Sequence, residues 1–218
     1  MATLLKSIHL SSGSGPPVIW ACARNKNSLF RKLKQMNLPN CYDPALITVD
    51  IQERLAPSVY NPEEVVSRAA VLLRGAAELG VPVIATEQYP KGLGNTIPAI
   101  TETFDPEKSV VVAKTSFSVF GEEKFREELA KAAPHTLIFC GIESHVCVLQ
   151  SVFDALEAGY PVIVAADAVS SRKEAEKLLA LETMRQAGAW VLSTETILFT
   201  LLKNSLHPSF KAISKLIK

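Results

Sequence analysis

The sequence lacks the features that mark several large classes of protein. Its 218 residues contain four cysteines, too few and too scattered for a disulfide-stabilised secreted domain. No apolar run approaches the roughly 18 residues that a membrane-spanning helix needs. The formal net charge is +1, so the chain as a whole has no electrostatic attraction to nucleic acid or to a membrane. We therefore expect a globular protein of a reducing compartment with neither nucleic-acid nor membrane partners.

Acidic residues are also absent from the first 42 positions, where six basic residues occur. Within this stretch, Leu29, Phe30, Leu33 and Met36 fall on one face of a helical period among the basic side chains. A basic, acid-free and amphipathic segment is typical of an organellar transit peptide. It is equally compatible with a basic arm on a cytoplasmic protein. We divide the chain into this arm or transit-like segment (1–42) and a folded domain (43–218), located in the cytoplasm or the mitochondrial matrix.

After residue 43, short apolar runs rich in β-branched residues alternate with amphipathic segments of helical period. Asn61 is predicted to cap the first helix, with Pro62 at its first position and Gly80 at its end. Strands that are apolar on both faces and alternate with helices indicate a parallel sheet covered on both sides. The pattern predicts one three-layer, doubly wound, Rossmann-like α/β domain. Its six strands are expected at 45–51, 81–87, 109–115, 136–141, 161–167 and 189–193, and its helices at 62–79, 122–132, 149–158, 174–187, 195–203 and 208–217.

Four polar residues stand at or just after the carboxyl ends of predicted strands: Asp50, Lys114, Cys147 and Asp167. In open parallel sheets the working site lies at that edge, and a lysine that closes an apolar strand is expected to emerge there. Cys147 falls at the start of a helix, where the helix dipole favours negative charge. An acid, an ammonium and a thiol are the parts of an activated nucleophile, so together they permit nucleophilic catalysis.

Each of these residues also has a purely structural interpretation. Cys147 can be a small buried hydrophobe, and Asp167 can tie down the loop that follows it. Cys140, inside an apolar strand, is predicted to belong to the core. His145 lies two residues before Cys147 on a predicted helix and would not face it, so no direct His–Cys pair is expected. No Cys-x-x-Cys pair or paired His spacing is present, so we predict neither a metal nor a cofactor.

Five segments together resemble the isochorismatase-like hydrolases, and most closely the isochorismatase domain-containing proteins. These segments are "TVDIQERL", "TEQYPKGLG", "AKTSFS", "GIESHVCVLQ" and "ADAVSSR", and the resemblance runs over residues 45–217. It implies a cysteine hydrolase with Asp50, Lys114 and Cys147 as its triad, acting on a small amide-like C–N substrate through an acyl-enzyme. It also implies a non-proline cis peptide at Ile142–Glu143, with backbone amides in that turn available to an oxyanion.

The sequence departs from the nicotinamidases of that family, which bind a metal through one aspartate and two histidines near the end of the second strand. Here that region reads "TEQYPKGLGNT" and contains neither residue type, so the resemblance implies a metal-independent enzyme. Nearness to the triad strand ends suggests that the pocket is lined by Gln88, Tyr89, Phe117, Phe120 and His145, although the two phenylalanines could equally be core.

The edges of the predicted sheet and the apolar final helices favour a homo-oligomer, and the resemblance implies a dimer or tetramer. Two other functions stay open. The first is a non-catalytic interaction protein that keeps the hydrolase fold. The second is a thiol redox protein in which Cys140 and Cys147 exchange a disulfide. The identity of the substrate does not follow from the sequence.

Overall fold

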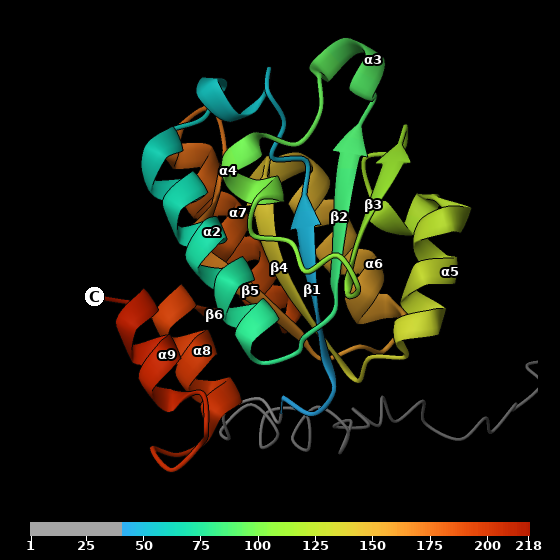
Figure 1. The fold of residues 1–218 in the computed structure, drawn as a ribbon. Coiled ribbons are helices and arrows are strands. Elements are labelled where there is room, and N and C mark those ends of the chain that lie inside the picture. The colour runs from blue at the N-terminus through green and yellow to red at the C-terminus, as the bar shows by residue number, and fades with distance from the viewer. Residues whose placement is uncertain (1–40) are drawn as a thin grey trace, which may run out of the picture. The chain divides into compact units, whose positions relative to one another are not determined.

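All six predicted strands form a single parallel sheet in the computed structural model, which describes residues 41–218 (Figure 1). The sheet order is β3-β2-β1-β4-β5-β6, so the chain starts at the centre, winds outward to one edge and returns to wind toward the other. This is the predicted doubly wound topology. The predicted arm at 1–42 lies, apart from its last two residues, outside the described part of the chain. The strands are Pro44–Val49 (β1), Val83–Gln88 (β2), Ser109–Lys114 (β3), Thr136–Ile142 (β4), Val162–Ser170 (β5) and Trp190–Leu192 (β6).

Two layers of helices cover the sheet (Figure 1). One layer consists of α2 (Pro62–Glu78), α8 (Thr194–Leu202) and α9 (Phe210–Leu216). The other consists of α5 (Glu123–Ala132), α6 (Leu149–Glu157) and α7 (Glu174–Ala187). The structure adds short elements that the alternating pattern did not predict: η1 (Ala56–Ser58), α3 (Pro90–Leu93), α4 (Pro98–Thr101), η2 (Val119–Gly121) and the π-helical turn η3 (Ser144–Val148). Within residues 41–218 no helix is both long and apolar enough to cross a bilayer.

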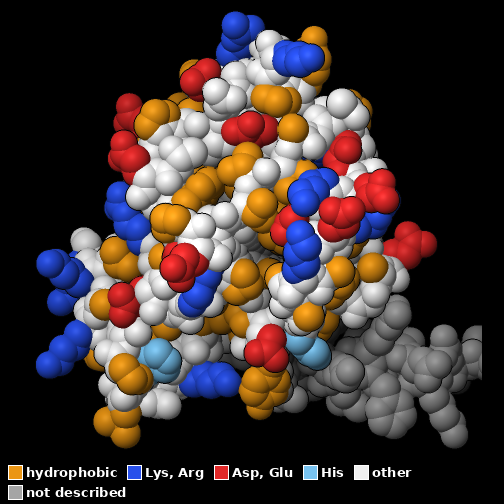
Figure 2. Space-filling model, turned by 45° about the vertical axis from the view of Figure 1, so that its right-hand side comes forward, with side chains coloured by type: hydrophobic (Ala, Val, Ile, Leu, Met, Phe, Trp, Pro, Cys, Tyr) orange, Lys and Arg blue, Asp and Glu red, His pale blue; other side chains and the backbone are white. Residues whose placement is uncertain are grey.

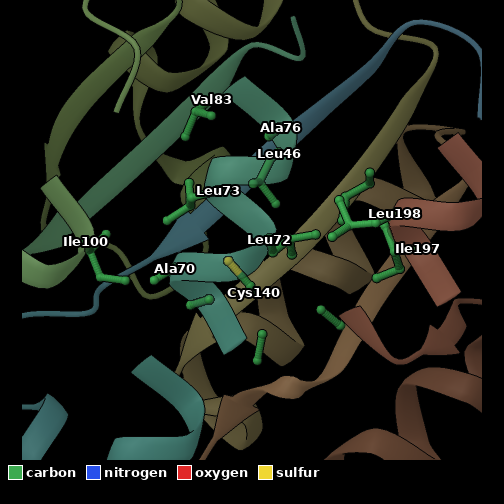
Figure 3. Close-up of a cluster of buried hydrophobic side chains, with 14 of the residues drawn as sticks. Leu46, Ala70, Leu72, Leu73, Ala76, Val83, Ile100, Cys140, Ile197 and Leu198 are labelled. Carbon is green, nitrogen blue, oxygen red and sulfur yellow. The ribbon is translucent and has the colours of Figure 1, made fainter. Parts of the chain in front are cut away.

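The alternation of side chains along each strand builds two separate apolar cores. On β1, Leu46 points into the core beneath α2, while Ile47 points into the core beneath α5, α6 and α7. Figure 3 shows the first core, where Leu72 and Leu73 of α2 pack toward β1 and β4. Burial of a leucine side chain contributes about 1.5–3 kcal/mol. A strand that is apolar on both faces is therefore stabilised by both cores. Such a strand has a continuous apolar run, which is why its position could be predicted from the sequence.

Two local predictions about this framework are wrong. Asn61 has a left-handed backbone (φ 49°) and its side chain makes no capping hydrogen bond to the helix. A capping residue normally has an extended backbone that returns its side chain to the first-turn amides, whereas Asn61 Nδ2 instead donates to Glu64 Oε2 at 3.3 Å. In addition, β5 continues to Ser170, so Asp167 lies within the strand rather than at its end.

At the carboxyl end of β4 the backbone passes unusually close to β1. Gly141 has a φ of +115°, and a Cβ atom built on it would lie 2.0 Å from the carbonyl oxygen of Val49. Only glycine fits this approach, because any side chain would collide with backbone that cannot move aside. The pairing of β4 with β5 also shifts between Phe139 and Gly141. The chain thus leaves the sheet beside the end of β1 and enters η3 there.

Charged side chains of both signs are interspersed on the face seen in Figure 2, without a large area of one sign. On α5, for example, Glu128 accepts from Lys124 at 2.8 Å and from Lys131 at 2.9 Å. Such exposed pairs contribute little to stability. The mixture on this face agrees with the formal net charge of +1.

Candidate active site

The carboxylate of the site is held at the end of the central strand. Asp50 follows β1 with a left-handed backbone (φ 50°), and it is completely buried. A non-glycine residue in this conformation costs of order 1 kcal/mol or more and persists where the surroundings enforce it. Thr86 of β2 supplies that enforcement, because its carbonyl accepts the Asp50 N–H at 3.1 Å and its hydroxyl donates to Asp50 Oδ1 at 2.7 Å. Asp50 Oδ2 is left facing the interior of the site.

Lys114 ends β3, two strands away from β1, and reaches Asp50 across β2. Its Nζ lies 2.8 Å from Asp50 Oδ2, with neither side chain exposed. Lys114 emerges at this edge of the sheet, but its side chain is enclosed there rather than exposed. The loop after β3 folds back over the side chain, and Nζ donates to the carbonyls of Ser116 and Phe117, each at 3.1 Å, and to Gln88 Oε1 at 2.5 Å. These oxygen partners replace the water that the ammonium would otherwise require.

Cys147 reaches the same point from β4 by way of the turn η3. The carbonyl of Glu143 accepts hydrogen bonds from the amides of Val146 at 3.1 Å and Val148 at 3.2 Å. The second bond spans five residues, the spacing of a π-helix, and such wide turns are frequent at functional sites. The hydroxyl of Ser151 then donates to the Cys147 carbonyl at 2.6 Å. In this position the Cys147 thiol lies close enough to Asp50 and Lys114 for the charges of both to act on its pKa.

Burial controls the protonation of the acid and the thiol. It raises the pKa of Asp50 above its ordinary value, and the Lys114 ammonium and the Thr86 hydroxyl act in the opposite direction. Burial, followed by the negative charge of Asp50, raises the pKa of Cys147 to about 12, and Lys114 offsets only part of this. Neither Lys114 nor the nearby start of the helix therefore lowers the pKa of Cys147 enough to produce a thiolate in the resting site. The arrangement instead holds a neutral thiol beside an ion pair whose carboxylate is a strengthened base.

The turn that precedes the cysteine contains a cis peptide bond at Ile142–Glu143, as the resemblance implied. The Glu143 carboxylate is tied to the loop after β5, because Oε2 accepts from the backbone N–H of Arg172 at 3.3 Å and from its Nε at 3.0 Å. His145 also faces this loop, with Nδ1 2.9 Å from Ser171 Oγ. His145 is therefore engaged away from Cys147, in agreement with the prediction that they form no dyad. Two contacts thus fix the outer side of the turn.

The residues predicted to line a pocket separate into different groups. Gln88 contacts Lys114 directly. Tyr89 and Phe117 stand at the rim, 57% and 54% exposed, and each is joined to Lys114 through a backbone hydrogen bond. Phe120 instead packs edge-on against Phe125, with ring centroids 5.3 Å apart, and so belongs to the core.

Gln52 is a buried member of the site that we did not predict. Its Nε2 donates to the carbonyls of Gln88 at 3.0 Å and Gly94 at 2.6 Å, while its Oε1 accepts the Gln88 N–H at 2.7 Å. It therefore joins the end of β2 to the loop beyond it and fixes the residue that contacts Lys114. A polar side chain two positions after Asp50, at the end of a buried strand, was the available signal.

Asp167, the fourth strand-end candidate, and Cys140, which was predicted to be core, both have structural positions. Asp167 Oδ1 accepts from the amide of Thr194 at 2.8 Å and from its hydroxyl at 2.9 Å, which anchors the start of α8. Cys140 lies in the core beneath α2, on the opposite side of the sheet from Cys147, with its sulfur 3.6 Å from Thr48 Oγ1 (Figure 3). This separation argues against a disulfide between the two cysteines. Among residues 41–218 no cluster of three or more His, Cys, Asp or Glu side chains could hold a metal ion.

Comparisons with known proteins agree with this architecture. A family model described as the isochorismatase domain matches residues 44–196. "Isochorismatase domain-containing protein 2" from Danio rerio is 40% identical over 173 residues, which cover 79% of this chain and 85% of that protein. The Homo sapiens protein of the same description is 39% identical over 175 residues, covering 79% and 82%. A solved structure described as MAR1 ribonuclease from Caenorhabditis elegans has a TM-score of 0.77 and 39% identity, and the match covers 83% of this chain and 92% of that one.

Proposed function

Since the chain belongs to the isochorismatase family of isochorismatase-like hydrolases, we propose that it is a cysteine hydrolase that cleaves an amide-like C–N bond in a small molecule. The observation that carries the proposal is the buried Asp50–Lys114 ion pair, 2.8 Å long, beside the Cys147 thiol, whose pKa both charges influence. Three residues far apart in the sequence meet at one point, and together they supply a nucleophile, a base and a fixed positive charge. No metal or cofactor enters this mechanism.

In the first half of the reaction the Cys147 sulfur attacks the carbonyl carbon of the substrate while its proton passes to Asp50. The raised pKa of the buried carboxyl makes Asp50 a better acceptor for this proton. Backbone amides of the turn at 143–147 stabilise the oxyanion that forms as the C–S bond is made. Asp50 then returns the proton to the departing nitrogen, the C–N bond breaks, and a thioester on Cys147 remains.

Water completes the reaction. Asp50 accepts a proton from the water as the water oxygen attacks the thioester carbonyl. The C–S bond then breaks and Asp50 returns this proton to the departing sulfur, which restores the neutral thiol and the carboxylate. Lys114 keeps its charge throughout, because its ammonium is fixed by Asp50 and three other oxygens. Its role is to stabilise the developing negative charge on sulfur and to hold Asp50 in place, rather than to exchange protons.

Hydrolysis of RNA is a second candidate, because the Caenorhabditis elegans relative is described as a ribonuclease. Two features weigh against it. Cleavage of a phosphodiester needs cationic groups free to contact the phosphate, whereas Lys114 is buried and already engaged. The face seen in Figure 2 also lacks the basic stripe that usually binds a nucleic-acid backbone.

The test is a mass-spectrometric screen of small amides and esters for covalent adducts, quenched with acid at short times. We expect an acyl adduct on Cys147 for at least one compound, no adduct and no turnover with Cys147→Ala, and unchanged behaviour with Cys140→Ala. The Cys140 control removes a buried thiol from the other core. Turnover that persists in Cys147→Ala would rule out the mechanism.

The same preparations are incubated with labelled single-stranded and hairpin RNA. Cleavage that is lost in Cys147→Ala, together with no adduct from any amide or ester, would favour the ribonuclease. The absence of both activities in a folded protein would favour a non-catalytic interaction protein.

A further inference from the structure

The side chain of Ser151, in the first turn of α6, joins two separate parts of the candidate site. Its hydroxyl donates to the carbonyl of Cys147 at 2.6 Å and accepts the backbone N–H of Val119 at 3.0 Å. A serine hydroxyl has one proton to donate and lone pairs to accept, so both bonds form at the same time. Cys147 belongs to η3, whereas Val119 opens η2 in the segment after β3. One side chain therefore connects the turn that carries the sulfur to the segment that encloses the Lys114 ammonium.

The segment after β3, residues 115–122, is a compact unit that we call the lysine loop. Its carbonyls at Ser116 and Phe117 accept from Lys114 Nζ, each at 3.1 Å. Within the loop, Glu122 Oε1 accepts from the Ser116 N–H at 3.0 Å and lies 2.8 Å from the Ser116 hydroxyl, so the two ends of the loop are joined. The position of the carbonyls around the ammonium therefore depends on how the loop is attached to the rest of the domain.

Neighbouring residues of the lysine loop are attached to α6 by hydrogen bonds of different kinds. Ser118 Oγ donates to Asp154 Oδ2 where both side chains are partly exposed, so water can replace either partner. Val119 and Ser151 are completely buried. No water can replace the bond between them, and its loss would leave an unpaired N–H in the core. The bond to Ser151 is therefore the stronger constraint on the loop.

We propose that Ser151 is a positioning residue, which fixes the distance between the lysine loop and the turn that carries Cys147. The inference rests on the proposed function, in which Lys114 stabilises the negative charge that develops on sulfur. That stabilisation depends on the separation of the two charges, and an error of about 1 Å in such a geometry can lower a rate by about 100-fold. Ser151 acts through its two backbone partners, and not through contact with the substrate.

The first test compares Ser151→Ala with Thr200→Ala in the full chain. Each variant loses a hydroxyl that donates to the carbonyl four residues earlier, but Thr200 lies on α8, outside the site. The rate of Cys147 acylation is measured over a range of p-nitrophenyl acetate concentrations. For Ser151→Ala we expect the maximal rate to fall by about 10- to 100-fold. The half-saturating ester concentration should stay unchanged, because Ser151 orients reacting groups and does not bind the ester.

The control variant Thr200→Ala should be acylated like the wild type. An unchanged maximal rate in Ser151→Ala, or an equal loss in both variants, would overturn the proposal.

The second test removes the same hydrogen bond from the side of the loop. Val119→Pro lacks the N–H that Ser151 accepts. Proline suits this position, because Val119 opens a helical turn and Ser118 before it has an extended backbone (φ −71°, ψ 137°). We expect a lower maximal rate, and no further loss when Val119→Pro is added to Ser151→Ala, because the two changes break one bond. Losses that multiply in the double variant would overturn the proposal. Thermal unfolding shows which variants fold, and should one single variant fail to fold, the other carries the test.

The third test does not depend on activity. Amide hydrogen exchange is measured for the lysine loop in the intact proteins. In Ser151→Ala the loop should exchange about tenfold faster than in the wild type, whereas Thr200→Ala should leave its exchange unchanged. If no compound acylates Cys147, the proposed function fails, while the exchange data still decide whether Ser151 fixes the loop. Acylation of the wild type together with unchanged loop exchange in Ser151→Ala would overturn the positioning role alone.

Discussion

Cys140 and Cys147 stand seven residues apart and are both buried, yet their surroundings differ. Burial raises the pKa of each thiol to about 12. Cys140 faces the core beneath α2, where its sulfur contacts the Thr48 hydroxyl. Cys147 lies near the carboxylate of Asp50 and the ammonium of Lys114, and the charges of both act on its pKa. The difference between the two sites is thus the presence of a base and a fixed charge, and not the acidity of the resting thiol.

Under the proposed mechanism, this comparison shows what distinguishes a nucleophile from a core cysteine in this fold. A lowered thiol pKa is one route to reactivity, but the proposed mechanism does not use it. In that mechanism the carboxylate accepts the thiol proton as the sulfur attacks. A buried thiol without such an acceptor should be inert, whatever its position in the sequence. The predictions below test this difference, beginning with the largest effect.

Removal of the proposed base should make the Cys147 thiol as unreactive as the Cys140 thiol. Asp50→Asn keeps the shape of the side chain but removes the proton acceptor, so we expect acylation of Cys147 to fall by about 10³-fold. The measurement is the rate of p-nitrophenol release from p-nitrophenyl acetate. The control is Asp167→Asn, which changes the aspartate that anchors α8 and should leave this rate within about twofold. Equal losses in the two variants would contradict the assignment of Asp50 as the base.

The boundary between the two environments is Gly141, where β4 leaves the sheet. Gly141→Ala places a Cβ atom 2.0 Å from the Val49 carbonyl oxygen, so we expect a loss of about 3 kcal/mol or more in the free energy of unfolding. Gly159→Ala is the control. Gly159 also has a positive φ (+91°), but nothing lies within 4 Å of its Cβ position, so the cost there should be only the backbone term of about 1–2 kcal/mol. Urea unfolding measures the free energy of unfolding of both variants. Similar losses for Gly141→Ala and Gly159→Ala would mean that the backbone at Val49 moves easily to accommodate the new Cβ atom.

Cys140 and Cys147 should contribute equally to the alkaline pH dependence of the free energy of unfolding if burial alone sets their pKa values. An unfolded thiol loses its proton near its ordinary pKa of 9.0, whereas both folded thiols keep theirs to about 12. Between these values the unfolded chain binds fewer protons, so the free energy of unfolding falls as pH rises, by at most about 1.4 kcal/mol per pH unit for each thiol. Cys140→Ala and Cys147→Ala should therefore each flatten the alkaline decline by a similar amount. A change in only one of them would show that the charges at Cys147 outweigh its burial.

Much of the framework followed from the sequence, because the strands are buried on both faces and their apolar runs are unambiguous. The same reasoning located Asp50, Lys114 and Cys147 at one edge of the sheet. It could not locate Gln52 and Thr86, which act through hydrogen bonds to residues more than thirty positions away. Contacts of that kind leave no periodic signal.

Other features depend on the conformation of loops, and the sequence is least informative there. It predicts Lys114 at the edge of the sheet but not the burial of its side chain, because the fold of the loop after β3 cannot be anticipated from its residues. It predicts an ordinary helix start where the π-helical turn η3 lies, since the side-chain pattern of one wide turn does not differ from that of a normal one. It predicts a cap at Asn61 because composition favours one there, while the actual backbone is left-handed.

The crowding around the Lys114 ammonium has a consequence for ligand discovery. An ammonium has three protons to donate, and four protein oxygens already share them. A carboxylate or phosphate on an incoming compound would have to displace one of these oxygens, so the lysine offers no attachment point for anionic inhibitors. Libraries of uncharged amides, nitriles and strained lactams are the better starting material for chemical probes of this protein.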